Sequence, residues 1–188
     1  MADYSVVNPS INPAVNYNDL LGWSYEPEDA TATELLAPGT LYVSRIPILN
    51  GILITNVLSF ITVISITASH AYNTVHNSAG VLLGQSPDQS GIINATTGPL
   101  IAALAGGPFP VSPLQNNDFI FAGVYVGAAG TGPTLAASAA IPAGLINVGT
   151  LPARRRQATT GIGNVTTVPN FTPSALTPAN NNPWVGIS

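Results

Sequence analysis

The sequence contains no cysteine and no lysine, and charged residues make up only 6% of its 188 residues. Without cysteine there is no disulfide framework, no thiolate zinc site and no cysteine nucleophile. A typical domain carries about 25% charged residues, so neutral polar groups must solvate most of this surface. The cations are Arg45 and the run Arg154, Arg155 and Arg156.

This shortage of charge favours association over an isolated existence in solution. The formal net charge is −4, and it is carried by few groups. Charge repulsion helps to keep proteins soluble and monomeric, and here it is weak. We therefore expect a protein that packs against copies of itself or against a larger assembly.

Hydrophobic residues make up 46% of the chain, and 18 glycines and 17 prolines punctuate it. Turn signals recur at intervals of roughly 8–12 residues, which is typical of a sandwich or barrel. The runs Thr40–Ile46 and Phe119–Val126 are predicted strands, rich in β-branched and aromatic residues. Asn50-Gly51 signals a hairpin turn, and the last five residues fit a closing strand. The prediction is an all-β, antiparallel β-sandwich, jelly-roll-like, over residues 39–188.

Two of the segments that could be interpreted as helical bear on the fold. Residues 51–71 are nearly long enough to span a bilayer, but polar residues interrupt them and no basic residues flank them, which favours strands. Leu100–Leu104 could form a short helix before Gly106 ends it.

Residues 1–38 are interpreted as an extended N-terminal attachment arm, because prolines interrupt them and their aromatic residues need a surface to bury against. The competing reading is a flexible tail that folds back on its own domain. The Arg154–Arg156 run either contacts an acidic partner, such as the arm of a neighbouring subunit, or forms a solvated loop. The candidate residues for such an inter-subunit contact are Trp23, Tyr25, Glu26, Glu28, Arg154, Arg155 and Arg156.

Material for catalysis is scarce. The only histidines are His70 and His76, and there is no G-x-S-x-G nucleophile motif. Asp88 and Asp118 lie in separate turns, so a carboxylate pair for glycan cleavage would have to be assembled by folding. No metal-binding loop is present. We therefore expect no enzymatic activity and no cofactor or metal.

A resemblance to a known family rests on Val75–Ser90, Gly98–Leu100, Phe119–Val126 and the C-terminal runs Leu176–Pro178 and Trp184–Ser188. These runs resemble a jelly-roll-like virion surface domain of tailed phages of actinobacteria, found in minor tail, tail-fibre and head-decoration proteins. The resemblance covers about residues 35–188. It implies a non-enzymatic structural subunit of the particle, present in several copies.

The expected partners are copies of the chain itself, as a homo-oligomer with a trimer as its expected form, and other virion proteins. An alternative function is adhesion to host glycans through Tyr72, Tyr125 and Trp184, and a less favoured one is a depolymerase that uses Asp88 or Asp118. One arginine triplet in an acidic chain argues against nucleic-acid binding. With no signal peptide at the polar, acidic N-terminus, the chain is expected to be made in the host cytoplasm and to reside on the surface of the phage particle.

Overall fold

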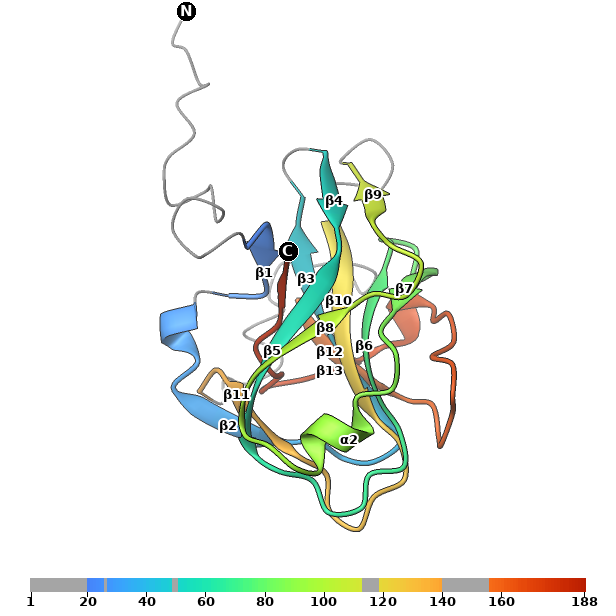
Figure 1. The fold of residues 1–188 in the computed structure, drawn as a ribbon. Helices are drawn as coiled ribbons and strands as arrows, with labels where there is room; N and C mark the ends of the chain where they lie inside the picture. Colours follow the sequence, from blue (N-terminus) through green and yellow to red (C-terminus); the bar gives the residue numbers. More distant parts are fainter. Residues whose placement is uncertain (1–19, 26, 49–50, 113–118, 140–155) are drawn as a thin grey trace, which may run out of the picture.

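The computed structural model of the chain describes residues 20–25, 27–48, 51–112, 119–139 and 156–188. These residues form two antiparallel six-stranded sheets and a two-stranded ribbon (Figure 1). Sheet A contains β1 (Gly22–Trp23), β14 (Gly186–Ile187), β5 (Asn56–Val63), β11 (Thr134–Ala137), β2 (Ala32–Leu35) and β8 (Gly98–Ala103). Sheet B contains β13 (Thr177–Pro178), β12 (Gln157–Gly161), β3 (Thr40–Pro47), β10 (Phe119–Val126), β6 (Ala71–His76) and β7 (Leu82–Gln85). The ribbon pairs β4 (Ile52–Ile54) with β9 (Phe109–Val111).

Helical structure in the described residues is limited to short pieces: the 3-10 helices η2 (Pro27–Asp29) and η4 (Pro173–Ala175), and the α-helix α2 (Ser90–Ile93). None of these is long and apolar enough to cross a bilayer. The all-β sandwich prediction is confirmed.

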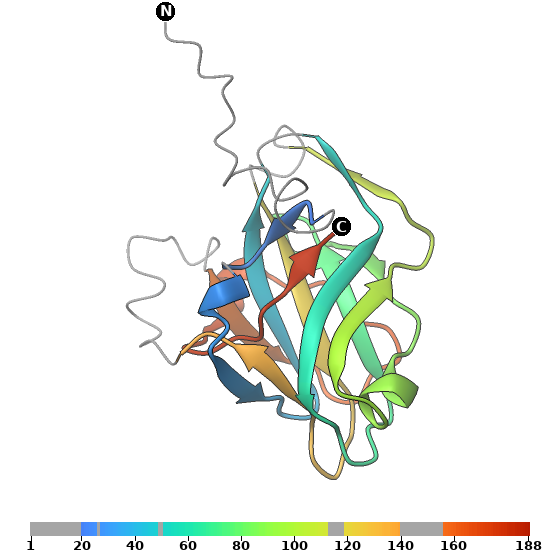
Figure 2. The same ribbon diagram turned by 60° about the vertical axis from the view of Figure 1, so that its left-hand side comes forward.

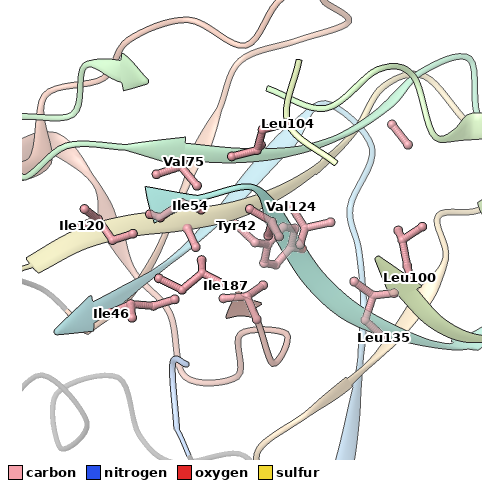
Figure 3. Close-up of a cluster of buried hydrophobic side chains, with 14 of the residues drawn as sticks. Tyr42, Ile46, Ile54, Val75, Leu100, Leu104, Ile120, Val124, Leu135 and Ile187 are labelled. Atoms are coloured by element: carbon pink, nitrogen blue, oxygen red, sulfur yellow. The ribbon is translucent and has the colours of Figure 1, made fainter. Parts of the chain in front are cut away.

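The two sheets stack face to face, and the main core lies between them (Figures 1, 2 and 3). Strand β5 of sheet A directs Val57 and Ile61 into this core, and β3 of sheet B directs Ile46 into it. The C-terminal strand β14 adds Ile187, which is fully buried. Burial of this apolar surface is the main favourable term in folding.

Strand β10 explains why sheet B has a second core. All eight of its residues are buried, and neighbouring side chains point to opposite faces of a strand. Ile120 and Val124 face sheet A. Phe121 and Tyr125 face the other way, into a second apolar cluster. A continuous apolar run of this kind is typical of a strand covered on both sides.

The second cover is the segment of residues 162–176, here called the covering segment, which places Val168, Phe171 and Leu176 on sheet B. The hydroxyl of Tyr125 donates to the Gly163 carbonyl at 2.6 Å and accepts from the Val165 N–H at 2.9 Å. These bonds, together with the apolar contacts, hold the covering segment against the sheet.

The covering segment is also tied to the edge of sheet B. Asn170 accepts a hydrogen bond from the Leu82 N–H at 2.8 Å, and the Gly80 carbonyl accepts from the Phe171 N–H at 3.0 Å. Gly80 has φ of 80°, and a Cβ added there would collide with the Phe171 carbonyl. A side chain at position 80 is therefore excluded by both conformation and space.

Several local predictions are confirmed, and others are corrected. The runs 40–46 and 119–126 form β3 and β10, and the C-terminal residues form β14. The segment 51–71 forms β4 and β5 in place of a helix. The alternative of a helix over residues 100–104 is wrong: this stretch belongs to β8, because pairing with β5 overrides its local preference. Of the predicted Asn50-Gly51 turn, Asn50 lies outside the described residues, and β3 and β4 on either side pair with other strands.

Part of the predicted arm belongs to the sandwich, which corrects the boundary at residue 38. Strand β1 pairs with β14, and β2 pairs with β11. Leu20 and Leu36 are buried. These strands are only two and four residues long, too short for periodicity to reveal. Residues 1–19 of the predicted arm lie outside the described residues.

Candidate functional site: the outer face of sheet A

The face of sheet A that points away from the core is exposed and apolar. In β5, Val57, Ser59 and Ile61 are buried, so the alternate residues Leu58 and Phe60 point outward. In β8, Leu100 and Ala102 are buried, so Pro99 and Ile101 point outward. The register sets Leu58 opposite Ile101 and Phe60 opposite Pro99. Adjacent strands therefore contribute one continuous apolar surface.

This surface extends over β11 to the edge strand β2. Thr134 lies opposite Val63 on one side and Leu35 on the other, and both of these apolar side chains are 55% exposed. Phe60 is 44% and Ile101 is 61% exposed. We define the outer face of sheet A by the side chains Thr33, Leu35, Leu58, Phe60, Val63, Pro99, Ile101, Thr134, Ala136 and Trp184.

No charged side chain belongs to this set of described residues. Glu34 of β2 is paired with Leu135, whose side chain is in the core. The Glu34 side chain therefore points to the core side of the sheet and not to its outer face. Its carboxylate accepts a hydrogen bond from the Asn181 amide at 3.0 Å. Burial raises the pKa of Glu34, and the bond from Asn181 opposes that shift. The solvent side of an antiparallel sheet is usually polar, so this uncharged apolar face is unusual.

The size of the face can be estimated from strand geometry. Four strands about 4.8 Å apart, over about five residues each, give roughly 300 Å². That is the scale of the largest apolar patches on monomers, which are often functional. It is less than half of the roughly 800 Å² that each partner contributes to a standard interface.

A groove of about 520 Å³ opens on this face beside β2. Pro27 and residues 30–33 form one side, and Phe60, Thr62, Ala136 and Trp184 line the rest. None of the lining residues is charged. The groove therefore offers apolar surface and threonine hydroxyls to a ligand.

Trp184 is held rigidly in this groove. Its indole N–H donates to the Tyr25 carbonyl at 3.0 Å, and its backbone N–H donates to the Ala136 carbonyl at 2.8 Å. Two residues earlier, the buried amide of Asn182 donates to the carbonyls of Val43 at 2.7 Å and Ala158 at 3.2 Å. The C-terminal segment thus links sheet B to the groove.

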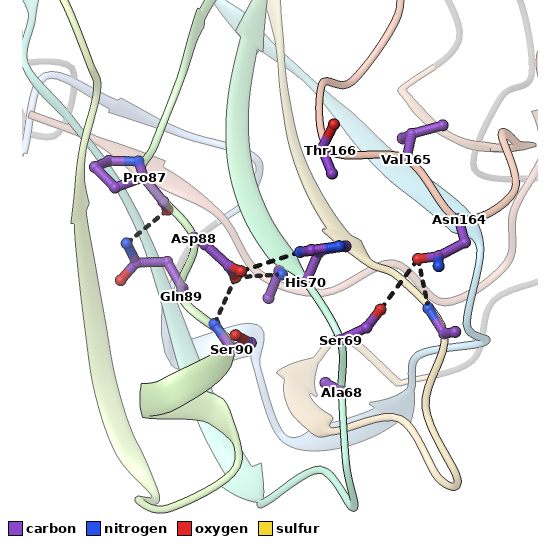
Figure 4. A network of polar contacts seen from close by, with 12 residues as sticks. Ala68, Ser69, His70, Pro87, Asp88, Gln89, Ser90, Asn164, Val165 and Thr166 are labelled. Atoms are coloured by element: carbon purple, nitrogen blue, oxygen red, sulfur yellow. Dashed lines mark hydrogen bonds and ion pairs between the residues drawn. The ribbon is translucent and has the colours of Figure 1, made fainter.

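A second cluster, of polar groups, lies at one end of the sandwich (Figure 4). Nδ1 of His70 lies 3.1 Å from Oδ2 of Asp88, and Oδ1 of Asp88 accepts from the backbone N–H groups of Ala71 and Ser90, each at 2.9 Å. Partial burial tends to raise the pKa of Asp88, but these hydrogen bonds outweigh it and lower the pKa. Nearby, Ser69 donates to the Asn164 side chain at 3.0 Å. These contacts fix the loop that contains Asp88, and the segment that contains Asn164, to the residues at the start of β6.

The structure separates the three residues predicted to contact a glycan. The rings of Tyr72 and Tyr125 are parallel, with centroids 6.1 Å apart, but Tyr72 is only 6% exposed and Tyr125 is fully buried. Trp184 lies on the other sheet. These three side chains do not form one platform, because Tyr72 and Tyr125 face the covering segment.

Of the predicted inter-subunit residues, the structure describes the side chains of Trp23, Tyr25 and Arg156. Trp23 lies in β1, and Tyr25 is half-buried, with its hydroxyl donating to the Asn182 carbonyl at 3.3 Å. Burial raises the pKa of Tyr25 well above its usual range. Arg156 is exposed. Glu26, Arg154, Arg155 and the alternative catalytic residue Asp118 lie outside the described residues, as does the side chain of Glu28.

Sequence reasoning missed the outer face of sheet A. The pattern of residues 51–71 predicts strands but does not mark Phe60 and Val63 as exposed, and both are. The alternation of Ser59 and Thr62 with apolar residues carries no sign of which side meets solvent. A strand that has apolar residues on both sides shows the same sequence pattern as a strand that is buried on both sides.

No protein-family model matches this sequence, and the comparison with curated proteins finds no match. Within the part of the chain that the structure describes, no three His, Cys, Asp or Glu side chains gather in a way that could hold a metal ion.

Proposed function

We propose that this chain is a non-enzymatic structural subunit of a phage virion, a minor tail or capsid-decorating protein. In this role it packs against copies of itself and against other virion proteins. Its contact surface is the outer face of sheet A, and the rest of the sandwich forms the surface of the particle.

The observation that carries this proposal is the uncharged apolar outer face of sheet A. Four of its large apolar side chains, Leu35, Phe60, Val63 and Ile101, are between 44% and 61% exposed. Removing apolar surface from water is favourable by about 25 cal/mol per Å². Since no charge on this face has to be desolvated, association gains this term without the penalty that a buried unpaired charge imposes.

Two features of the sequence support a place in a particle. The runs Val75–Ser90 and Phe119–Val126 resemble a virion surface domain, as described above. The charge content of 6% leaves little repulsion between closely packed copies.

The alternatives have less support. A glycan platform would need exposed aromatic rings, and Tyr72 and Tyr125 are buried. A depolymerase would need two carboxylates that flank the scissile bond; Asp88 is paired with His70 and with two backbone N–H groups, and Asp118 lies outside the described residues.

The test is the oligomeric state of the full chain by sedimentation equilibrium, with Ile101→Glu beside it. We expect the wild type to form a homo-oligomer at micromolar concentration. Ile101→Glu should weaken it at least tenfold, because the new charge must be desolvated in the contact. Val81→Glu is the matched control, since Val81 is 43% exposed and precedes β7 of the other sheet.

A monomeric wild type at 100 µM (about 2 mg/ml) would overturn the proposed self-association. Equal effects of the two substitutions would overturn the assignment of the surface. Mass spectrometry of purified particles from infected cells should then find the chain in multiple copies per virion, and its absence from them would overturn the structural role.

A further inference from the structure

We infer that the groove beside Trp184 binds residues 7–18 of a second copy of this chain. The inference rests on the proposed function and names the partner of the same surface. It follows from the fit between the groove and a pattern in the N-terminal sequence.

Residues 7–18 alternate strictly between two kinds of side chain. The odd positions are apolar: Val7, Pro9, Ile11, Pro13, Val15 and Tyr17. The even positions are small or polar: Asn8, Ser10, Asn12, Ala14, Asn16 and Asn18. In an extended chain, alternate side chains point to opposite sides. In an extended conformation the segment would therefore have one apolar side about 40 Å long, at roughly 3.3 Å per residue.

The two prolines suit docking against a face. Pro9 and Pro13 lack a backbone N–H and disfavour helix at the residues before them, so the sequence favours an extended segment. Proline is tolerated only at edges of a sheet, which argues against insertion into the middle of one. An extended segment that is already restricted loses less entropy on binding.

The charges of the two surfaces also match. No residue between Tyr4 and Asn18 is charged, and no residue lining the groove is charged. The outer face of sheet A spans only about 20 Å, so it would cover about six residues of the segment. A docked segment would add contact area that the roughly 300 Å² face lacks for a standard interface.

The proposed self-association favours a second copy over the same one. Strand β1 runs antiparallel to β14, with Trp23 opposite Gly186 and Gly22 opposite Ile187. The N–H of Leu21 donates to the Ile187 carbonyl at 2.8 Å, and the Leu20 side chain lies beside Gly186. Trp184 lies at the other end of this pairing. A segment that docks in a neighbour's groove joins two copies, as the proposed self-association requires.

The absence of cysteine allows a direct crosslinking test with full-length chains. Ile11→Cys is mixed with Thr33→Cys, which places a thiol in the groove, and disulfide formation is followed on non-reducing gels. The control partner is Thr177→Cys, because Thr177 is also an exposed edge-strand threonine but lies in sheet B. We expect heterodimer with Thr33→Cys to form at least tenfold faster than with Thr177→Cys, and 0.5 M NaCl should not slow it.

A second pair of variants tests the alternation itself. Ile11→Asp and Ser10→Asp introduce the same charge on opposite sides of the segment. We expect Ile11→Asp to raise the self-association Kd at least tenfold and Ser10→Asp to change it less than threefold. Equal effects would overturn the inference.

The doubly substituted chain, Ile11→Cys with Thr33→Cys, separates the two possible sources of the segment. Crosslinked dimers and higher species support a second copy, while a monomer with an internal disulfide overturns it. If the wild type self-associates but both cysteine partners crosslink equally, only this inference fails. If the wild type is monomeric by sedimentation, the proposed self-association fails as well.

Discussion

His76 should make this protein less stable as the pH is lowered from 6.5 to about 4. It lies on β6, fully buried beneath the covering segment. Its ring packs on Phe171 with centroids 4.7 Å apart. Both ring nitrogens of His76 are buried, and neither has a well-formed hydrogen bond. Burial lowers the pKa of His76 from 6.5 to about 4, and the nearby Pro169 carbonyl opposes that shift only in part.

The magnitude follows from linkage between protonation and folding. Above pH 6.5 the imidazole is neutral in the folded and unfolded chain, so the free energy of unfolding does not change with pH. As the pH falls from 6.5 to about 4, the unfolded chain binds a proton that the folded chain excludes, and stability is lost. One pKa unit is worth about 1.4 kcal/mol, so the total loss is about 3 kcal/mol.

The assay is urea unfolding followed by tryptophan fluorescence between pH 3.5 and 7.5, with His76→Phe beside the wild type. The variant removes the titrating group and keeps an aromatic ring against Phe171. Carboxylates titrate in both proteins, so the difference between the two curves isolates His76. We expect this difference to change by about 3 kcal/mol in favour of the variant on going from pH 7 to pH 4.

The control is Val75→Ala, a substitution on the same strand that removes no titrating group. This variant should keep the wild-type loss of stability between pH 6.5 and 4. Parallel curves for wild type and His76→Phe would refute the reasoning, because they would mean that His76 protonates equally in both states.

Three further predictions concern stability at defined contacts. Tyr125→Phe removes the hydroxyl that bonds the covering segment and should lower the free energy of unfolding by about 1–2 kcal/mol, measured by urea unfolding; an unchanged value would mean that these bonds are not needed. Asn182→Ala removes two buried hydrogen bonds, to the carbonyls of Val43 and Ala158, and should cost about 2 kcal/mol; a thermal shift of less than a degree would contradict this. Asp88→Asn should cost less than about 1 kcal/mol at pH 7, since the carboxylate is 37% exposed. Because hydrogen bonds hold the folded pKa of Asp88 below 3.8, that cost should be present above pH 3.8 and disappear as the pH falls through the folded pKa.

The strands with strong local signals were predictable from the sequence. Phe119–Val126 forms β10 because its β-branched and aromatic residues fit a pleated, buried surface. Thr40–Ile46 forms most of β3 for the same reason. In contrast, Leu100–Leu104 had a plausible helical reading, and only its pairing with β5 makes it a strand. The short strands β1 and β2 within the predicted arm carry no periodic signal at all.

The sequence by itself determined the class of fold, the lack of thiol chemistry and the shortage of charge, because these follow from composition and local pattern. The tertiary structure alone decided which apolar side chains meet solvent. Phe121 and Phe60 sit in similar runs, yet Phe121 is fully buried and Phe60 is 44% exposed. The physical reason is that a covering segment, distant in sequence, packs on the outer side of sheet B, whereas within the described chain nothing comparable covers β5 and β8 of sheet A. Local pattern sets the two sides of a strand, and only the folded chain sets what lies against each side.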